Sequence, residues 1–243
     1  MRPEIVVVLL NPKEDGNVGA VSRVMSNFDA TKLLIVNPRA KLGEEARRRA
    51  MAGLSLLKSA TVVPTLKEAI ADADLVVGTT DLSTGRTRSY LRRSVSPTDW
   101  GRMVGSVEGK VAILFGPEDN GLGVEDLALC DVLVFIPTSS SSPTLNLSHA
   151  VAILLYETFL GLEVTTRHRA EPFKLSGKEK AVFFALLDKA LAECHYPEHK
   201  RHSIKLLFRR LLGRATASEY EYAMLLGFVR RMLRKSQTRS ADA

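Results

Sequence analysis

Residues 111–157 read VAILFGPEDNGLGVEDLALCDVLVFIPTSSSSPTLNLSHAVAILLYE and decide the fold of this chain. The two apolar runs, Val111–Phe115 and Val132–Ile136, are typical of strands covered on both faces in an α/β protein. Each run ends in a loop rich in Gly, Pro, Ser or Asn, which favour turns. Because open α/β sheets bind ligands at the carboxyl ends of their strands, we expect a ligand crevice there. Neither loop matches a Walker phosphate loop or a dinucleotide-binding fingerprint.

Upstream of this segment, short apolar runs alternate with helical patterns. Strands are predicted over Ile5–Leu10, Leu33–Val36, Thr61–Val63 and Asp74–Gly78. Helices are predicted from about Asn17 to Phe28, over Ala46–Lys58, and over Thr65–Ala71 with Thr65 as the N-cap. This alternation predicts an α/β fold, with about six strands in a mostly parallel sheet and helices on both of its faces.

The last third of the chain is different in pattern. Three amphipathic segments, each with one apolar stripe, predict a small helical bundle over Lys178–His195, His199–Gly213 and Ser218–Arg234. A polar stretch with Pro172 precedes them. We therefore expect an α/β domain over residues 1–165, a linker over 166–176 and a basic helical domain over 177–243.

Basic charge is concentrated in that helical domain. Residues 167–243 hold 17 Lys and Arg against 8 Asp and Glu, a net charge of +9, whereas residues 1–166 have a net charge of −2. Such asymmetry favours binding of a polyanion, with a solvated helical surface as the alternative. The polar side of the middle helix carries Arg214 and five candidate phosphate contacts: Lys200, Arg201, Lys205, Arg209 and Arg210. A second basic group, Arg86, Arg88, Arg92 and Arg93, follows the Asp74–Gly78 strand and is suited to bidentate phosphate binding.

Several classes of protein are not favoured by the sequence. The opening MRPEIVVVLL meets Asn11-Pro12 too early for a signal peptide, and charges or Pro interrupt every apolar stretch before it could span a membrane. The two cysteines, Cys130 and Cys194, fit neither a disulfide scaffold nor a zinc site, and no metal is expected. We expect a cytoplasmic protein in which Cys130 and His149 are packed residues. Glu118 is expected to serve the turn as a backbone cap rather than as an acid or base.

Five motifs carry a resemblance to a known family. In order and spacing, NVGAVSRVM, LLIVNP, DLVVGTT, LFGPEDNGL and PTLNLSHAVAILLYE resemble the SPOUT class of RNA methyltransferases. The tail, from YPEHKRHSIKLLFRRLLGRA to FVRRM, resembles the helical extension of the TrmJ group of tRNA 2′-O-methyltransferases. The resemblance covers nearly the whole chain. It implies a sheet whose C-terminal part forms a trefoil knot, a homodimer, S-adenosylmethionine as cofactor and tRNA as partner.

The resemblance also implies roles for individual residues. The cofactor would lie against the knot loops, at Thr79, Thr80, Asp81, Gly116, Ile136, Thr144, Leu145 and Asn146. Arg23 matches the arginine of the first motif that has been cast as a general base. Because arginine stays protonated in proteins, a phosphate clamp that orients the 2′-hydroxyl is the alternative role. Asn17 and Asn146 would hold the loops and the ribose or cofactor, and Arg86 or Arg88 would bind phosphate.

The resemblance implies 2′-O-methylation of tRNA at position 32 of the anticodon loop. Two other functions are left open: methylation of another RNA such as ribosomal RNA, and RNA binding without activity. The C-terminal position of the basic helices favours the anticodon-loop group, and retention of Asn17, Arg23 and Asn146 argues against an inactive protein. The preference for cytidine or uridine stays open.

Overall fold

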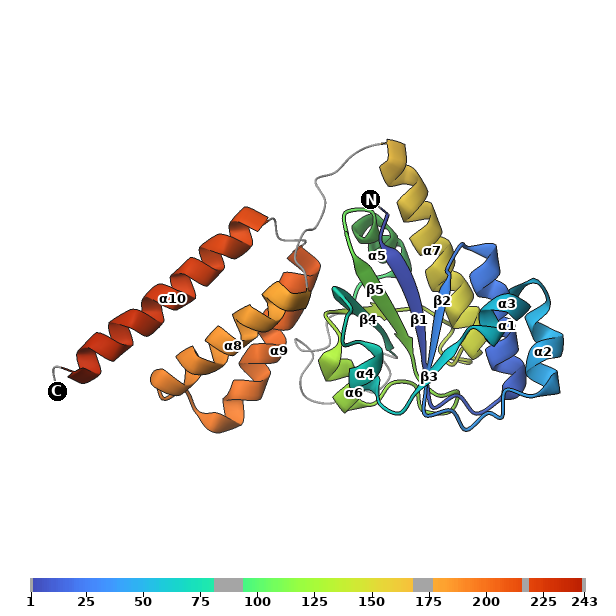
Figure 1. Cartoon of the computed structure of the whole chain (residues 1–243), viewed down its shortest axis with the longest axis horizontal. Helices are drawn as coiled ribbons and strands as arrows, with labels where there is room; N and C mark the ends of the chain where they lie inside the picture. Colours follow the sequence, from blue (N-terminus) through green and yellow to red (C-terminus); the bar gives the residue numbers. More distant parts are fainter. Residues whose placement is uncertain (1, 81–93, 168–176, 216–218, 242–243) are drawn as a thin grey trace.

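The computed structural model describes residues 2–80, 94–167, 177–215 and 219–241. The chain forms an α/β domain followed by a bundle of helices (Figure 1). The strands are β1 (Glu4–Leu10), β2 (Lys32–Val36), β3 (Thr61–Val63), β4 (Leu75–Thr80), β5 (Lys110–Phe115) and β6 (Val132–Phe135). The helices are α1 (Asp15–Asn27), α2 (Glu44–Ala50), the 3-10 turn η1 (Met51–Gly53), α3 (Leu54–Lys58), α4 (Leu66–Ala69), α5 (Pro97–Val104), α6 (Val124–Leu129), α7 (Leu147–Arg167), α8 (Gly177–Glu193), α9 (Glu198–Ala215) and α10 (Glu219–Ala241).

The six strands form one parallel sheet in the order β3-β2-β1-β5-β4-β6. The predicted parallel sheet is therefore confirmed, and each predicted strand lies within about two residues of its observed ends. The order places β4 between β5 and β6, so three strand ends meet at one part of the carboxyl edge. Thr79 pairs with Val134 of β6, and Gly78 pairs with Leu114 of β5.

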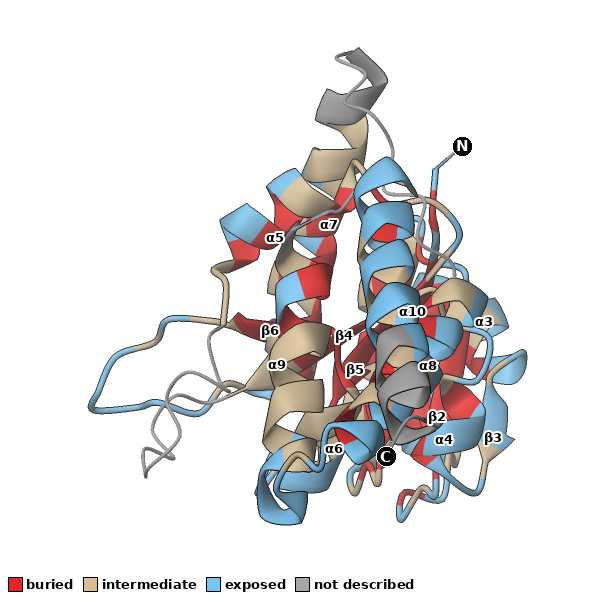
Figure 2. Cartoon of the chain, turned by 90° about the vertical axis from the view of Figure 1, so that its left-hand side faces the viewer, coloured by how far each residue is buried: buried red, intermediate tan, exposed pale blue. Residues whose placement is uncertain are grey.

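Alternate side chains of each strand enter two apolar cores, as the pleat of a strand requires. In β1, Ile5, Val7 and Leu9 face the core shared with α1, α2, α5 and α7. Val6, Val8 and Leu10 face the core shared with α4 and α6. Figure 2 shows the strands buried between these helical layers. The sheet is thereby a buried platform for the loops at its edges.

One predicted helix is interrupted. The predicted helix over Ala46–Lys58 is split into α2, η1 and α3, because Met51 has a positive φ of 46°. Such a φ is uncommon for a residue other than glycine and ends the regular helix. The prediction for Thr65 is confirmed, since its side chain accepts a hydrogen bond from the backbone N–H of Glu68 at the start of α4.

The bundle has its own aromatic core. The Phe183 ring of α8 lies 5.7 Å from the Phe208 ring of α9 and 5.9 Å from the Tyr222 ring of α10, centroid to centroid. The proposed linker falls almost wholly outside the described residues, although α7 runs to Arg167, past its expected boundary. Among the described helices, none combines the length and apolar character needed to cross a membrane.

Candidate active site

A cavity of about 380 Å³ lies at the carboxyl edge of the sheet, where the sequence predicted a ligand crevice. Its walls are the ends of β4, β5 and β6, the loop before α6, and the start of α7. Six of the residues predicted to bind the cofactor line it: Thr79, Thr80, Gly116, Ile136, Thr144 and Leu145. Asp81, also predicted, lies outside the described residues. Asn146 is placed between lining residues Leu145 and Leu147 and is exposed.

A hydrogen-bonded chain beside this cavity joins three motifs that are far apart in the sequence. The Asn146 amide donates to the Asn17 side-chain oxygen at 2.9 Å. The Asn17 amide in turn donates to Glu118 at 3.0 Å. Asn146 is itself held by its own turn, because its side-chain oxygen accepts from the backbone N–H of Ser148 at 2.9 Å and from the Ser148 hydroxyl at 2.7 Å. The two asparagines predicted as site residues are thus brought into direct contact.

Glu118 caps the helix that carries Asn17. Its carboxylate accepts the backbone N–H of Lys13 at 3.0 Å and that of Glu14 at 3.2 Å, just before α1 begins. Glu14, the N-cap residue itself, provides no side-chain cap. Burial opposes ionisation, but the hydrogen bonds from Asn17 and the backbone outweigh it and lower the pKa of Glu118. A carboxylate with a lowered pKa is a weak base, which agrees with the predicted capping role.

Arg23 lies outside this hydrogen-bonded chain. It is exposed on α1, six residues beyond Asn17 and therefore about 9 Å further along the helix axis. His149 is also exposed, in the first turn of α7. The prediction of a packed His149 is therefore wrong: the apolar face of α7 is formed by Val151, Leu154 and Leu155, and His149 falls outside it.

The glycine at the end of β5 is required by close backbone packing. A Cβ built on Gly116 would lie 2.1 Å from the carbonyl carbon of Gly121, within the same loop. The loop can therefore fold back over the cavity only with glycine at this position. Gly121 has a positive φ of 63°, which completes the turn.

The basic residues predicted to bind RNA have different environments. Arg86, Arg88, Arg92 and Arg93 lie outside the described residues. On α9, Lys200 is exposed, Arg201 donates to the Tyr196 carbonyl at 2.9 Å, and Lys205 pairs with Asp188 at 3.0 Å. Arg209 and Arg210 instead face the α/β domain, and Arg210 is only 2% exposed. In this conformation Arg210 is not presented to a ligand in solvent.

Known proteins resemble this chain over most of its length. The model of the SpoU rRNA Methylase family matches residues 4–156, which span the sheet, the cavity and the first half of α7. The chain belongs to this family. The SPOUT resemblance expected from the five motifs is thereby confirmed, and the matched segment contains Asn17, Arg23, Glu118 and Asn146.

Relatives cover the helical domain as well. The tRNA (cytidine-2′-O-)-methyltransferase TrmJ of Methanocaldococcus jannaschii is 37% identical over 223 residues, covering 89% of this chain and 94% of the relative. The tRNA (cytidine/uridine/adenosine-2′-O-)-methyltransferase TrmJ of Pseudomonas aeruginosa is 30% identical, covering 94% and 93%. The crystal structure of TrmJ from Z. mobilis ZM4 superposes with a TM-score of 0.67 at 27% identity, covering 93% of this chain and 98% of that one.

The cavity fits the methyl donor used by this family's reaction. Its volume falls within the usual range for small-molecule sites. Apolar side chains of Leu122, Leu127 and Phe135 form part of its wall beside the hydroxyls of Thr79 and Thr138, a combination suited to an adenine ring, a ribose and an amino acid group. Leu122 and Leu127 were not among the predicted residues. They belong to the loop and helix after Gly116, and only folding brings them to the cavity.

Proposed function

We propose that this protein is an S-adenosylmethionine-dependent tRNA 2′-O-methyltransferase that modifies the nucleotide at position 32 of the anticodon loop. The observation that carries this proposal is the hydrogen bond between Asn17 and Asn146 beside the cavity. It joins the first and last motifs of the methylase family into one site. The relatives that extend over the helical domain, and are named for tRNA 2′-O-methylation, support tRNA as the substrate.

In this proposal the residues act mainly by positioning. When bound, S-adenosylmethionine supplies a methyl group on a positively charged sulfur. Thr79, Thr80, Asp81, Gly116, Ile136, Thr144 and Leu145 would hold it through the loops around the cavity. Asn17 and Asn146 would orient the ribose, and the loops around the cavity would exclude water that competes with the 2′-hydroxyl.

Arg23 would bind the phosphate next to the target ribose. Its exposure on α1 leaves the guanidinium accessible to RNA. A guanidinium forms two parallel hydrogen bonds to a phosphate, which fixes the orientation of the neighbouring hydroxyl. This role needs no deprotonation, whereas a role as general base would need a large shift of an arginine pKa.

RNA binding outside the pocket is proposed for two basic groups. Arg86 and Arg88 would contact phosphate near the cavity, because they follow β4 closely in the sequence. On the helical domain, Lys200, Arg201 and Lys205 would contact phosphates of the tRNA body. Arg209 and Arg210, also predicted for this task, are engaged with the α/β domain and act in docking instead.

We further propose a homodimer, a knotted C-terminal part of the α/β domain and a cytoplasmic location. An exposed apolar surface beside α1 and α7 supports the dimer. On α7, Tyr156 is 49% exposed and Leu160 is 39% exposed. Phe28 lies beside them, 6.1 Å from the Tyr156 ring. Large apolar side chains gathered at the surface are typical of an interface.

Ribosomal RNA is the second candidate substrate, favoured by the description of the family whose model matches. The test is transfer of labelled methyl from S-adenosylmethionine to unmodified tRNA and rRNA transcripts, followed by nuclease mapping. Label in a nuclease-resistant dinucleotide at position 32 of tRNA would support the proposal. Label at another tRNA nucleotide would contradict the position alone, and label in rRNA only would contradict the substrate.

A further inference from the structure

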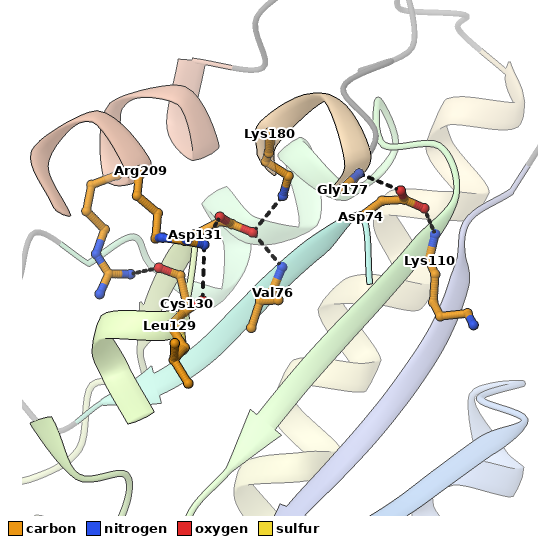
Figure 3. Close-up of polar contacts among 10 residues, drawn as sticks. Asp74, Val76, Lys110, Leu129, Cys130, Asp131, Gly177, Lys180 and Arg209 are labelled. Atoms are coloured by element: carbon orange, nitrogen blue, oxygen red, sulfur yellow. Dashed lines mark hydrogen bonds and ion pairs between the residues drawn. The ribbon is translucent and has the colours of Figure 1, made fainter. Parts of the chain in front are cut away.

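The helical domain is attached to the sheet through a buried carboxylate. Asp131, just before β6, is 1% exposed and lies at the amino edge of the sheet, opposite the cavity. It accepts hydrogen bonds from the backbone N–H of Val76 at 2.9 Å, from Lys180 of α8 at 2.8 Å and from Arg209 of α9 at 3.1 Å (Figure 3). Burial alone would raise the pKa of Asp131, but the charges of Lys180 and Arg209 outweigh this and lower it.

A second contact reaches the end of α6. Arg210 donates to the Cys130 carbonyl at 2.8 Å and to the Leu127 carbonyl at 2.5 Å. Arg209 adds a longer hydrogen bond of 3.4 Å to the Leu129 carbonyl. The last carbonyls of a helix have no partner within it, and cations bind there favourably. Two arginines of α9 therefore cap α6 from outside the domain that contains it.

The capped segment forms part of the cavity wall. Leu127 lines the cavity directly, and Leu122, in the loop before α6, lines it as well. Cys130 packs against Gly78, where an added Cβ would lie 2.5 Å from the Cys130 sulfur. Gly78 is followed at once by Thr79 and Thr80, which line the cavity from β4. The segment held by Arg210 thus contacts two walls of the site.

From these contacts we infer that Arg210 is a positioning residue for the cofactor pocket, acting through α6. The inference rests on the proposed function only in naming S-adenosylmethionine as the occupant. Arg210 has no carboxylate partner of its own among the described residues, and burial lowers its pKa to about 10, so it is still charged at neutral pH. Burying this charge is unfavourable unless the carbonyls bind it well. The geometry therefore ties the shape of the pocket to the docked position of α9.

The test measures S-adenosylmethionine binding to the full-length protein by calorimetry, together with thermal unfolding without ligand. Arg210→Gln removes the charge and the guanidinium donors to the Leu127 and Cys130 carbonyls, while Leu127 keeps the hydrogen bond from the Cys130 backbone N–H. We expect its dissociation constant to rise about tenfold, within the range typical of coupling between sites. Arg210→Lys keeps the charge but reaches one carbonyl, so a rise of about threefold is expected, equivalent to one hydrogen bond.

Two control variants separate positioning from loss of stability. Leu191→Ala destabilises the bundle at a buried site of α8, and Asp188→Asn removes a surface ion pair. Both should bind S-adenosylmethionine as the wild-type protein does. Wild-type affinity in both Arg210 variants would overturn the inference, and so would an equal loss in Leu191→Ala. If the wild-type protein itself bound no S-adenosylmethionine, the proposed function would fail instead. Should the Gln variant not fold, the Lys variant decides.

Discussion

Replacing Glu118 by alanine should loosen the start of α1 and, with it, the position of Asn17. The carboxylate accepts three hydrogen bonds, from the backbone of Lys13 and Glu14 and from the Asn17 amide. Water can reach these partly exposed donors, so the loss resembles removal of an N-cap, about 0.5–2 kcal/mol, rather than three charge-assisted bonds in full. For a chain of this length we expect the melting temperature to fall by roughly 1–8 °C.

The assay is thermal unfolding followed by circular dichroism, with methyl transfer measured on the same samples. Asp119→Asn is the matched control, because Asp119 lies in the same loop but forms an exposed ion pair with Lys13, which contributes little. Activity should fall in Glu118→Ala, since Asn17 loses one of its two side-chain partners. Melting of Glu118→Ala at the wild-type temperature would refute the capping role.

The destabilisation caused by Glu118→Ala should become smaller as the pH falls into the acid range. The pKa of Glu118 is below its ordinary value of 4.5 in the folded protein, so folding favours the ionised form. Its contribution to stability is therefore fully present above pH 4.5 and is lost as the pH falls through the lowered pKa. The difference in melting temperature between wild type and Glu118→Ala should be constant from pH 6 to 8 and should close in acid. A difference that widened in acid would contradict the assignment.

Three further predictions concern other parts of the molecule. Arg23→Ala should lower methyl transfer roughly a hundredfold or more while leaving S-adenosylmethionine binding unchanged, as measured by kinetics and calorimetry; near-full turnover would remove Arg23 from the site. Gly116→Ala should lower both the melting temperature and cofactor affinity, because the added Cβ would meet the Gly121 backbone at 2.1 Å. Iodoacetamide at pH 8 should label exposed Cys194 and spare Cys130, whose pKa burial raises to about 12; mass spectrometry would show the site.

The strands were predictable from sequence because their apolar runs are short, uninterrupted and bounded by turn residues. A parallel sheet buried on both faces requires such runs, as in Val111–Phe115. The order of the strands was not predictable in the same way. Nothing in the Asp74–Gly78 run indicates that β4 inserts between β5 and β6, because strand order depends on which helices cross which face.

The candidate site was predictable to the extent that the family motifs carried it. Asn17 and Asn146 were expected together, and the structure joins them by a hydrogen bond. Turn chemistry predicted that Glu118 caps backbone groups, but the helix it caps begins about a hundred residues earlier in the chain. Two residues so far apart in the sequence produce no periodic pattern from which their contact could be predicted. The partners of a carboxylate in a turn become known only when the fold is known.

Arg210 shows why a charge pattern on a helix is ambiguous. The apolar stripe of α9, with Ile204 and Phe208, predicted one buried face and left Arg210 on the polar side. The helix in fact packs on two sides, against the bundle and against the end of α6. An amphipathic pattern records which residues are apolar, and it cannot record that a second neighbour offers carbonyl oxygens instead of apolar atoms.

The amino edge of the parallel sheet explains why some cations of the basic tail are not available to bind RNA. At the amino edge, Asp74 and Asp131 accept backbone N–H groups from neighbouring strands, at Lys110 and Val76. Carboxylates fixed there need compensating donors, and the tail supplies them: the backbone N–H of Gly177 binds Asp74, and Lys180 and Arg209 bind Asp131. Part of the positive charge of the tail is therefore paired with Asp131 in the docked position. Fewer cations of the tail can face RNA than its composition indicates. The salt dependence of tRNA binding should therefore be shallower than it would be if all 17 cations bound phosphate.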